Sequence, residues 1–183
     1  VTKKLYSGEK GIEVIPCFYK MTYPEWAPFD RSEGRPVHND RGPAVMAQTT
    51  KGSGTKDVLA NGNEIIKTAN HFVVILGDKP EKALMSLKTT QLKTSRGWNS
   101  LMDNEMITSS TGKSIPAPAF SRVYKINSVE NTGNFTWHGM TVNLVRPVDN
   151  AEIYSMAKDF NNALQKSNVA AASVETNTEE SNY

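Results

Sequence analysis

Two β-hairpin patterns with one helical stretch between them constrain the fold of this chain more than any other feature. The four strands expected in these hairpins are 71–76, 82–88, 120–129 and 135–148. Each pair combines β-branched or aromatic residues with a short turn rich in Gly, Asp or Asn, which is typical of antiparallel strands. Residues 89–107 lie between the hairpins, contain no proline and predict a helix.

Further elements are expected on both sides of the hairpins. Residues 12–26 are rich in β-branched and aromatic residues and predict a long strand, whereas 27–63 are rich in Gly, Pro, Asp and Asn and predict a long mobile arm. Asp149, followed three positions later by Glu152, predicts the start of a last helix through an acidic variant of the capping box. The small and polar residues 167–183 predict a disordered acidic tail.

The order of these elements predicts a mainly β fold of the α+β class. Three strands, a helix and two strands form the order of an OB-fold, a five-stranded Greek-key barrel with a helix between strands 3 and 4. We therefore expect one OB-like domain over 1–166 with a C-terminal helix. An α+β domain with an open antiparallel sheet is the alternative.

The charge is unevenly distributed along the chain. The formal net charge is +2, but residues 167–183 hold three glutamates and no Lys or Arg, so the body carries five more basic than acidic residues. A basic body with an acidic tail is a pattern of nucleic-acid partners. The single Cys17 excludes an intramolecular disulfide and fits a reducing compartment. The chain has neither an apolar run of membrane-spanning length nor a signal-peptide pattern, so no membrane partner is expected.

Motifs for catalysis or cofactor binding are weak in this sequence. The stretch TGKS at 111–114 resembles part of a phosphate loop, but Ile107 stands where that motif requires its first glycine. The three histidines are scattered, so no set of metal ligands is visible, and His71 at the start of a core strand is expected to be a hydrogen-bonded structural residue. We therefore expect no enzymatic activity, no metal and no cofactor.

The stretch SLKTTQLKTSRGWNSLM, at 86–102, contains the most informative polar pattern. No acid occurs from Lys82 to Met102, and three cations are spaced among hydroxyl and amide side chains. Such side chains make most of the contacts that proteins form with nucleic-acid phosphates. Trp98 is expected in the core, beside Leu101.

A protein that binds a single strand without sequence preference needs cations for the phosphates and aromatic faces for the bases. The residues predicted to supply such a groove are Tyr19, Lys20, Tyr23, Trp26, Arg31, Arg35, Lys82, Lys88, Lys93, Arg96, Arg122, Lys125 and Trp137. Among them, Lys88, Lys93 and Arg96 are the expected phosphate contacts, and the stacking candidates are Tyr19, Tyr23, Trp26 and Trp137. Aromatic residues on strands also fill cores, so a structural role is the alternative for each of these side chains.

Five segments together resemble a family of small proteins of tailed bacteriophages: 12–26, 61–76, 86–102, 120–129 and 137–148. Many members of that family are uncharacterised, and some are labelled single-stranded DNA-binding proteins. The resemblance covers about 11–165 and is most specific at 86–102. It implies a protein that coats single-stranded DNA during replication or recombination in the cytoplasm of an infected bacterium. It also implies a further segment before Val1, which fits a chain that does not begin with Met.

The partners expected from this resemblance are single-stranded DNA, phage replication proteins bound through the acidic tail, and further copies of the chain in a homo-oligomer. The main alternative is a virion component, either a capsid-decorating or a tail-associated protein. A third possibility is a small phage protein that inhibits or redirects a host enzyme.

Overall fold

The computed structural model describes residues 7–54, 56–133 and 136–180, with side chains described as far as residue 168. The chain divides into two compact units. Unit 1 consists of Val1–Phe18, Phe72–Ala83 and Trp98–Tyr183, and unit 2 consists of Tyr19–His71 and Leu84–Gly97. The two units are described separately below.

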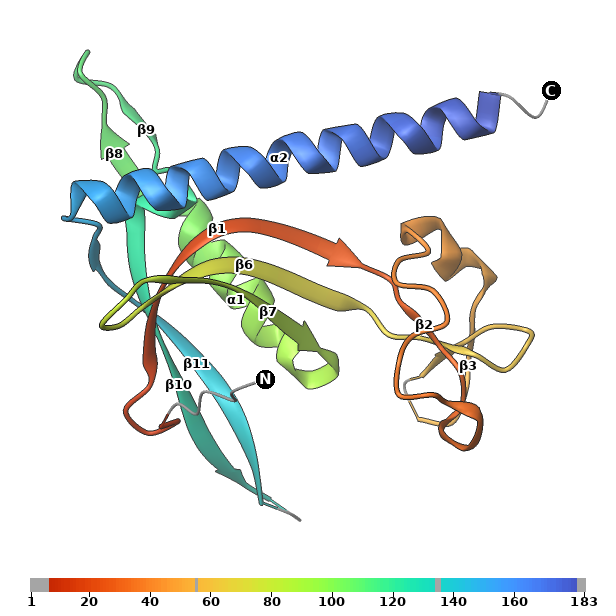
Figure 1. The fold of residues 1–183 in the computed structure, drawn as a ribbon. Helices are drawn as coiled ribbons and strands as arrows, with labels where there is room; N and C mark the ends of the chain where they lie inside the picture. The colour runs from red at the N-terminus through yellow and green to blue at the C-terminus, as the bar shows by residue number, and fades with distance from the viewer. Residues whose placement is uncertain (1–6, 55, 134–135, 181–183) are drawn as a thin grey trace. The chain divides into compact units, whose positions relative to one another are not determined.

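The main sheet has five strands in the order β11-β10-β1-β6-β7 (Figure 1). Its strands are β1 (Ile12–Thr22), β6 (Thr68–Leu76), β7 (Glu81–Lys88), β10 (Arg122–Thr132) and β11 (Thr136–Pro147). The prediction of a mainly β fold with two hairpins is confirmed. The prediction of a closed barrel is wrong, because the sheets are antiparallel and open, with β11 and β7 as the two edges of the largest one.

The helix expected between the hairpins is α1 (Leu92–Asp103), preceded by the 3-10 turn η3 (Thr89–Gln91). It ends earlier than predicted, because β8 (Met106–Thr108) begins within the stretch predicted as helix and forms a small hairpin with β9 (Ser114–Pro116). Three long strands, a helix and two long strands therefore follow one another along the chain as predicted.

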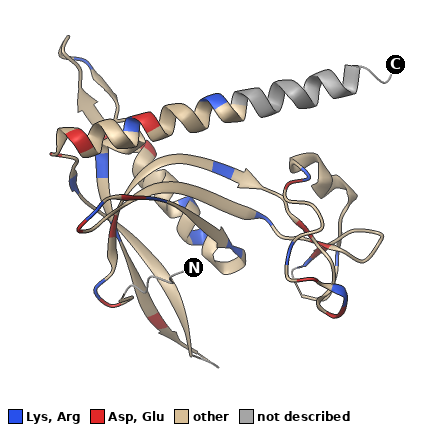
Figure 2. Cartoon of the chain, viewed as in Figure 1, with Lys and Arg blue, Asp and Glu red and all other residues tan. Residues whose placement is uncertain are grey.

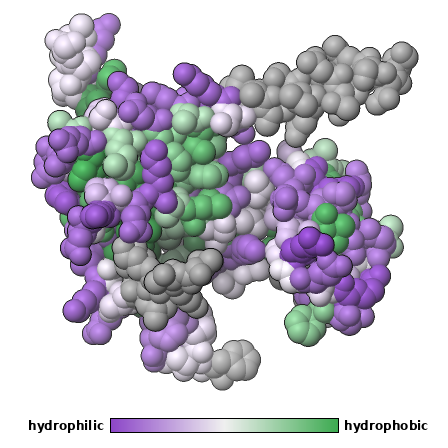
Figure 3. All heavy atoms as spheres, in the orientation of Figure 1, coloured by the Kyte–Doolittle hydropathy of each residue, from purple (hydrophilic) through white to green (hydrophobic). Residues whose placement is uncertain are grey.

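Unit 1 has a core between its strands and the long helix α2 (Ala151–Glu180). Its buried members are Ile15, Cys17, Val74, Val123 and Ala157. Partly buried Ile153, Met156 and Phe160 on the first turns of α2 pack against them, and Figure 3 shows apolar side chains gathered below this part of the helix. Residues 153, 156, 157 and 160 recur at helical spacing, which places this apolar face against the sheet.

The start of α2 differs from the prediction by one residue. Asn150 caps the helix, since its Oδ1 accepts hydrogen bonds from the backbone N–H groups of Glu152 at 2.9 Å and Ile153 at 3.0 Å. Asn and Asp cap helices almost equally well, so the sequence could not distinguish the two neighbouring candidates.

Trp98 is a core residue of unit 1, as predicted. Its indole is buried and packs edge-on against the buried ring of Tyr124, with 5.9 Å between the ring centroids. This contact ties the second half of α1 to β10.

Unit 2 contains a second, smaller sheet in the order β2-β5-β4-β3. Its strands are β2 (Glu25–Trp26), β3 (Thr50–Lys51), β4 (Asp57–Val58) and β5 (Glu64–Ile65), and the 3-10 turns η1 (Phe29–Arg31) and η2 (Pro43–Gln48) connect them. Buried Val45, Leu59 and Ile65 form a separate core. The segment predicted as a mobile arm therefore carries a sheet and apolar packing of its own.

The backbone of α2 continues to Glu180 through most of the segment for which a disordered tail was predicted. The side chains from residue 169 onward lie outside the described part, so the prediction for the tail remains a prediction. None of the helices described is both long and apolar enough to span a bilayer.

Candidate nucleic-acid interface

The first turns of α1, which belong to unit 2, carry an exposed basic face. Lys93 and Arg96 are both exposed and lie three positions apart, so they occupy the same side of the helix. Within the described residues neither side chain forms an ion pair, and the nearest acid in sequence is Asp103 at the end of the helix. Figure 2 shows the corresponding blue segments on this part of the helix.

The opposite side of these turns is fixed by a buried histidine. The Oγ of Ser95 lies 2.8 Å from the Nε2 of His71, and both residues are buried. Burial lowers the pKa of His71 to about 4, so the ring is neutral at pH 7. This hydrogen bond orients α1 in unit 2 with Lys93 and Arg96 outward, and it confirms the predicted structural role of His71.

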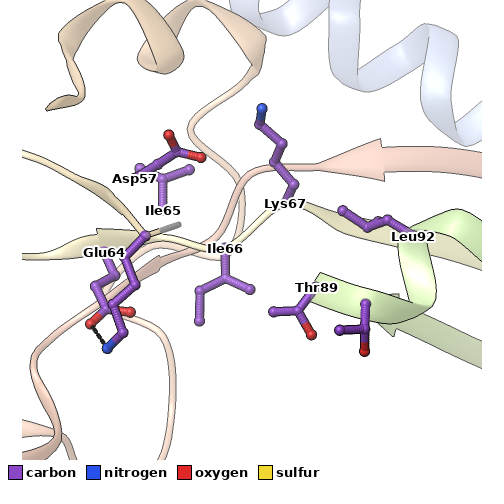
Figure 4. A pocket seen from close by; sticks show the side chains of 9 residues that line it. Asp57, Glu64, Ile65, Ile66, Lys67, Thr89 and Leu92 are labelled. Carbon is purple, nitrogen blue, oxygen red and sulfur yellow. Dashed lines mark hydrogen bonds and ion pairs between the residues drawn. The ribbon is translucent and has the colours of Figure 1, made fainter. Parts of the chain in front are cut away.

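An open pocket of about 470 Å³ lies at the N-terminal end of α1, and all of its lining residues belong to unit 2 (Figure 4). Its lining residues are Lys56, Asp57, Glu64, Ile65, Ile66, Lys67, Thr89, Thr90 and Leu92. Lys56 pairs with Glu64, and Asp57 pairs with Lys51 outside the pocket. Lys67 has no ion-pair partner in the described part of the chain, so it is the cation of this pocket that remains available to an anion.

Thr89 holds a strained backbone at the rim of this pocket. Its φ is +49°, and it is the one non-glycine residue with a positive φ in the described chain. The left-handed region costs a β-branched residue of this kind on the order of 1–2 kcal/mol. Thr89 and Thr90 both line this pocket.

Lys88, the last residue of β7, lies over the ring of Trp26, with 4.9 Å from its Nζ to the ring centroid. One face of this predicted stacking residue is thus covered by a cation. The indole Nε1 of Trp26 is buried and has no hydrogen-bond partner among the described residues. Tyr19 is also partly covered, since its ring packs against His71 with 5.0 Å between the centroids.

The remaining predicted residues of unit 2 lie in varied surroundings. Lys20 pairs with Asp40 at 3.6 Å, and Arg35 pairs with Glu33 at 2.7 Å, so local acids partly neutralise both cations. Tyr23 packs against the small core, whereas Arg31 is exposed.

The other four predicted residues belong to unit 1. Lys82 lies 5.1 Å from the ring centroid of Phe160, and Arg122 binds Glu105 through its Nε at 2.9 Å. Lys125 is on β10, and Trp137, half-exposed at 50%, is at the start of β11. The thirteen predicted residues are therefore divided between the units, and nine of them belong to unit 2.

Sequence reasoning missed the two lysines of the pocket and a buried carboxylate, that of Glu25. Glu25 is only 3% exposed, and its Oε1 accepts hydrogen bonds from the amides of Asn63 at 2.6 Å and Asn61 at 3.3 Å. Burial by itself raises the pKa of this carboxyl, but the two amides, the guanidinium of Arg41 and the imidazole of His38 lower it overall.

The network around Glu25 has a structural role, because the described contacts of the carboxylate join two segments of unit 2, one with His38 and Arg41 and one with Asn61 and Asn63. No group of three or more His, Cys, Asp or Glu side chains suited to a metal ion occurs in the described residues.

The comparison with protein families gives one decisive result. The model of a family described as "Pam3 phage gp34-like protein" matches residues 1–170 of the chain. The chain belongs to this family. The resemblance to phage proteins seen in the sequence is therefore confirmed at the level of a phage protein family.

The other comparisons add no relative to the Pam3 phage gp34-like family. No curated protein and no solved structure matches the chain.

Proposed function

We propose that this phage protein binds single-stranded DNA without sequence preference and coats it during replication or recombination in the cytoplasm of the infected cell. The observation that carries the proposal is the surface at residues 88–96 of unit 2. On this surface Lys93 and Arg96 are exposed and have no acidic partner among the residues that the structure describes. The neighbouring pocket is lined by Lys67, Thr89 and Thr90.

The physical role of this surface follows from the charge of the strand. Lys93 and Arg96 would neutralise phosphates and release condensed counterions, which provides affinity independent of base sequence. The hydroxyls of Thr89 and Thr90 would contact a further phosphate or a sugar at the pocket, and Lys67, whose ammonium group points away from Thr89 in Figure 4, would contact a different phosphate. Contacts of this kind position a strand but do not read its sequence.

The aromatic part of the proposal rests on the order of strands. OB-folds bind oligonucleotides on strands 2 and 3 and with the loops that join strands 1 and 2 and strands 4 and 5. In an OB-like reading of this sheet, the first loop corresponds to the segment between β1 and β6, which contains Tyr23 and Trp26. The second loop is the turn between β10 and β11, with Trp137 beside it. We propose these aromatic residues, together with Tyr19, as stacking partners for bases.

The test is a titration of a fluorescein-labelled poly-dT oligonucleotide with the double variant Lys93→Gln, Arg96→Gln. Loss of two phosphate contacts is expected to weaken binding about tenfold at low salt and to reduce the salt slope by about 1.4. A matched control is Lys79→Gln, Lys113→Gln, which removes the same charge from two exposed lysines of unit 1.

Equal weakening by both double variants would mean that only net charge matters and would contradict a specific role of α1. If the parent chain does not bind the oligonucleotide at all, the alternative of a virion component is favoured. That alternative predicts co-purification with phage particles.

A further inference from the structure

The pocket at the N-terminal end of α1 has an aliphatic wall that contacts with phosphate and sugar do not use. Ile66 and Leu92 line the pocket and are partly exposed. In Figure 4 the side chain of Ile66 lies between those of Glu64 and Thr89, and the side chain of Leu92 extends from the first residue of α1. Two separate segments of unit 2 therefore bring apolar surface to an otherwise polar pocket.

The charge of the lining suits a neutral group better than a phosphate. Two cations and two carboxylates line the pocket: Lys56, Lys67, Asp57 and Glu64. Both carboxylates are in ion pairs with lysines, and the ammonium group of Lys67 points away from Thr89 in Figure 4. The space beside Ile66 thus combines apolar surface with a lining of no net charge.

A nucleobase has the complementary chemistry, because its faces are flat and apolar and its edge is polar. Proteins that take a base out of the stack hold its faces against aromatic or apolar side chains. The ion pair of Lys56 with Glu64 presents both donors and acceptors, so the edge of any base can find a partner there. The pocket volume of about 470 Å³ lies within the range of about 300–1,000 Å³ that is usual for small-molecule sites.

We propose that this pocket holds one unpaired base of the bound strand, with a face of the base on Ile66 and Leu92 and its edge toward the Lys56–Glu64 pair. Thr89 and Thr90 then contact the sugar and phosphate of the same nucleotide. The proposal rests on the binding of single-stranded DNA proposed above and gives one base a specific place in it. A base that is paired in a duplex cannot enter, so the pocket favours single strands.

The test compares two fluorescein-labelled oligonucleotides of equal length and charge, poly-dT and a strand in which every nucleotide is abasic. The parent chain should bind poly-dT more tightly in anisotropy titrations. Leu92→Gln keeps a helix-forming side chain of similar length but removes apolar surface from the pocket. It should weaken binding to poly-dT about fivefold and leave both the affinity for the abasic strand and the salt slope unchanged.

Leu101→Gln is the matched control, because Leu101 is a 41% exposed leucine on the same helix and does not line the pocket. Its binding to both oligonucleotides should equal that of the parent chain, and circular dichroism establishes that each variant is folded. The proposal is wrong if Leu92→Gln weakens binding to both oligonucleotides equally, or if Leu101→Gln weakens binding to poly-dT as much as Leu92→Gln does.

A photochemical cross-link tests the position of the base without any substitution in the protein. Poly-dT that contains 5-iodouracil, irradiated with the parent chain, should become attached to peptides that contain 64–67 or 89–92. Cross-links confined to other segments would overturn the proposal. A parent chain that binds poly-dT no more tightly than the abasic strand would also overturn it but would leave the phosphate contacts in place, whereas a parent chain that binds neither would contradict the proposed function itself.

Discussion

His71 is the residue whose surroundings most clearly predict a response to pH. The folded chain binds a proton on His71 only near pH 4, whereas the unfolded chain does so near 6.5. Its contribution to stability is therefore present above about pH 6.5 and is lost as the pH falls towards 4. We expect the free energy of unfolding to fall by about 2 kcal/mol from this residue between about pH 7 and pH 5.

Urea denaturation of the parent chain and of His71→Gln at both pH values tests this expectation. The variant should be less stable at pH 7, because glutamine fits the contact with Ser95 less well, but its stability should depend less on pH. An identical pH dependence in the two proteins would show that the imidazole is accessible to protons in the folded state.

Lys93 and Arg96 are the residues for which the sequence was most informative. Their lack of acidic neighbours is a local property, and a helix period fixes which residues share a face, so both could be placed on an exposed surface in advance. Lys67 could not be found in this way, because it lines the same pocket as Thr89 and Thr90 only through the packing of segments that are more than 20 positions apart in the chain.

The junction between β7 and α1 is an element under strain, and its strain can be measured. Asparagine tolerates the left-handed conformation of position 89 better than threonine does. Thr89→Asn is therefore expected to raise the free energy of unfolding by about 0.5–1 kcal/mol.

The control for this element is Thr90→Asn, which changes a neighbouring exposed threonine whose φ is not positive. Urea denaturation should show no gain in stability for this variant. A destabilised Thr89→Asn protein would mean that the hydroxyl or the methyl group of Thr89 contributes more than the backbone strain costs.

The long strands of the main sheet could be predicted because each contains an apolar or aromatic pattern of six residues or more. The second sheet could not, since each of its four strands has only two residues and none carries a periodic signal. Its stability comes instead from Val45, Leu59 and Ile65, which are far apart in sequence, and from the hydrogen bonds to Glu25. Turn-forming residues between such short strands resemble those of a flexible loop.

At the scale of the molecule, the order of elements was predictable but the closure of the sheet was not. Closure of a barrel requires a pairing between the first and last strands of the sheet, and this depends on twist and stagger that a single sequence does not specify.

The phage family and the basic surface of unit 2 together make the central claim testable in one experiment. Fluorescence anisotropy of a labelled poly-dT oligonucleotide should be followed during titration with the parent chain, at about 50 mM and about 200 mM salt. The account predicts tight binding at the lower concentration and a steep loss of affinity at the higher one, because phosphate contacts release counterions. Absence of binding at about 50 mM salt would contradict the claim that this protein coats single-stranded DNA.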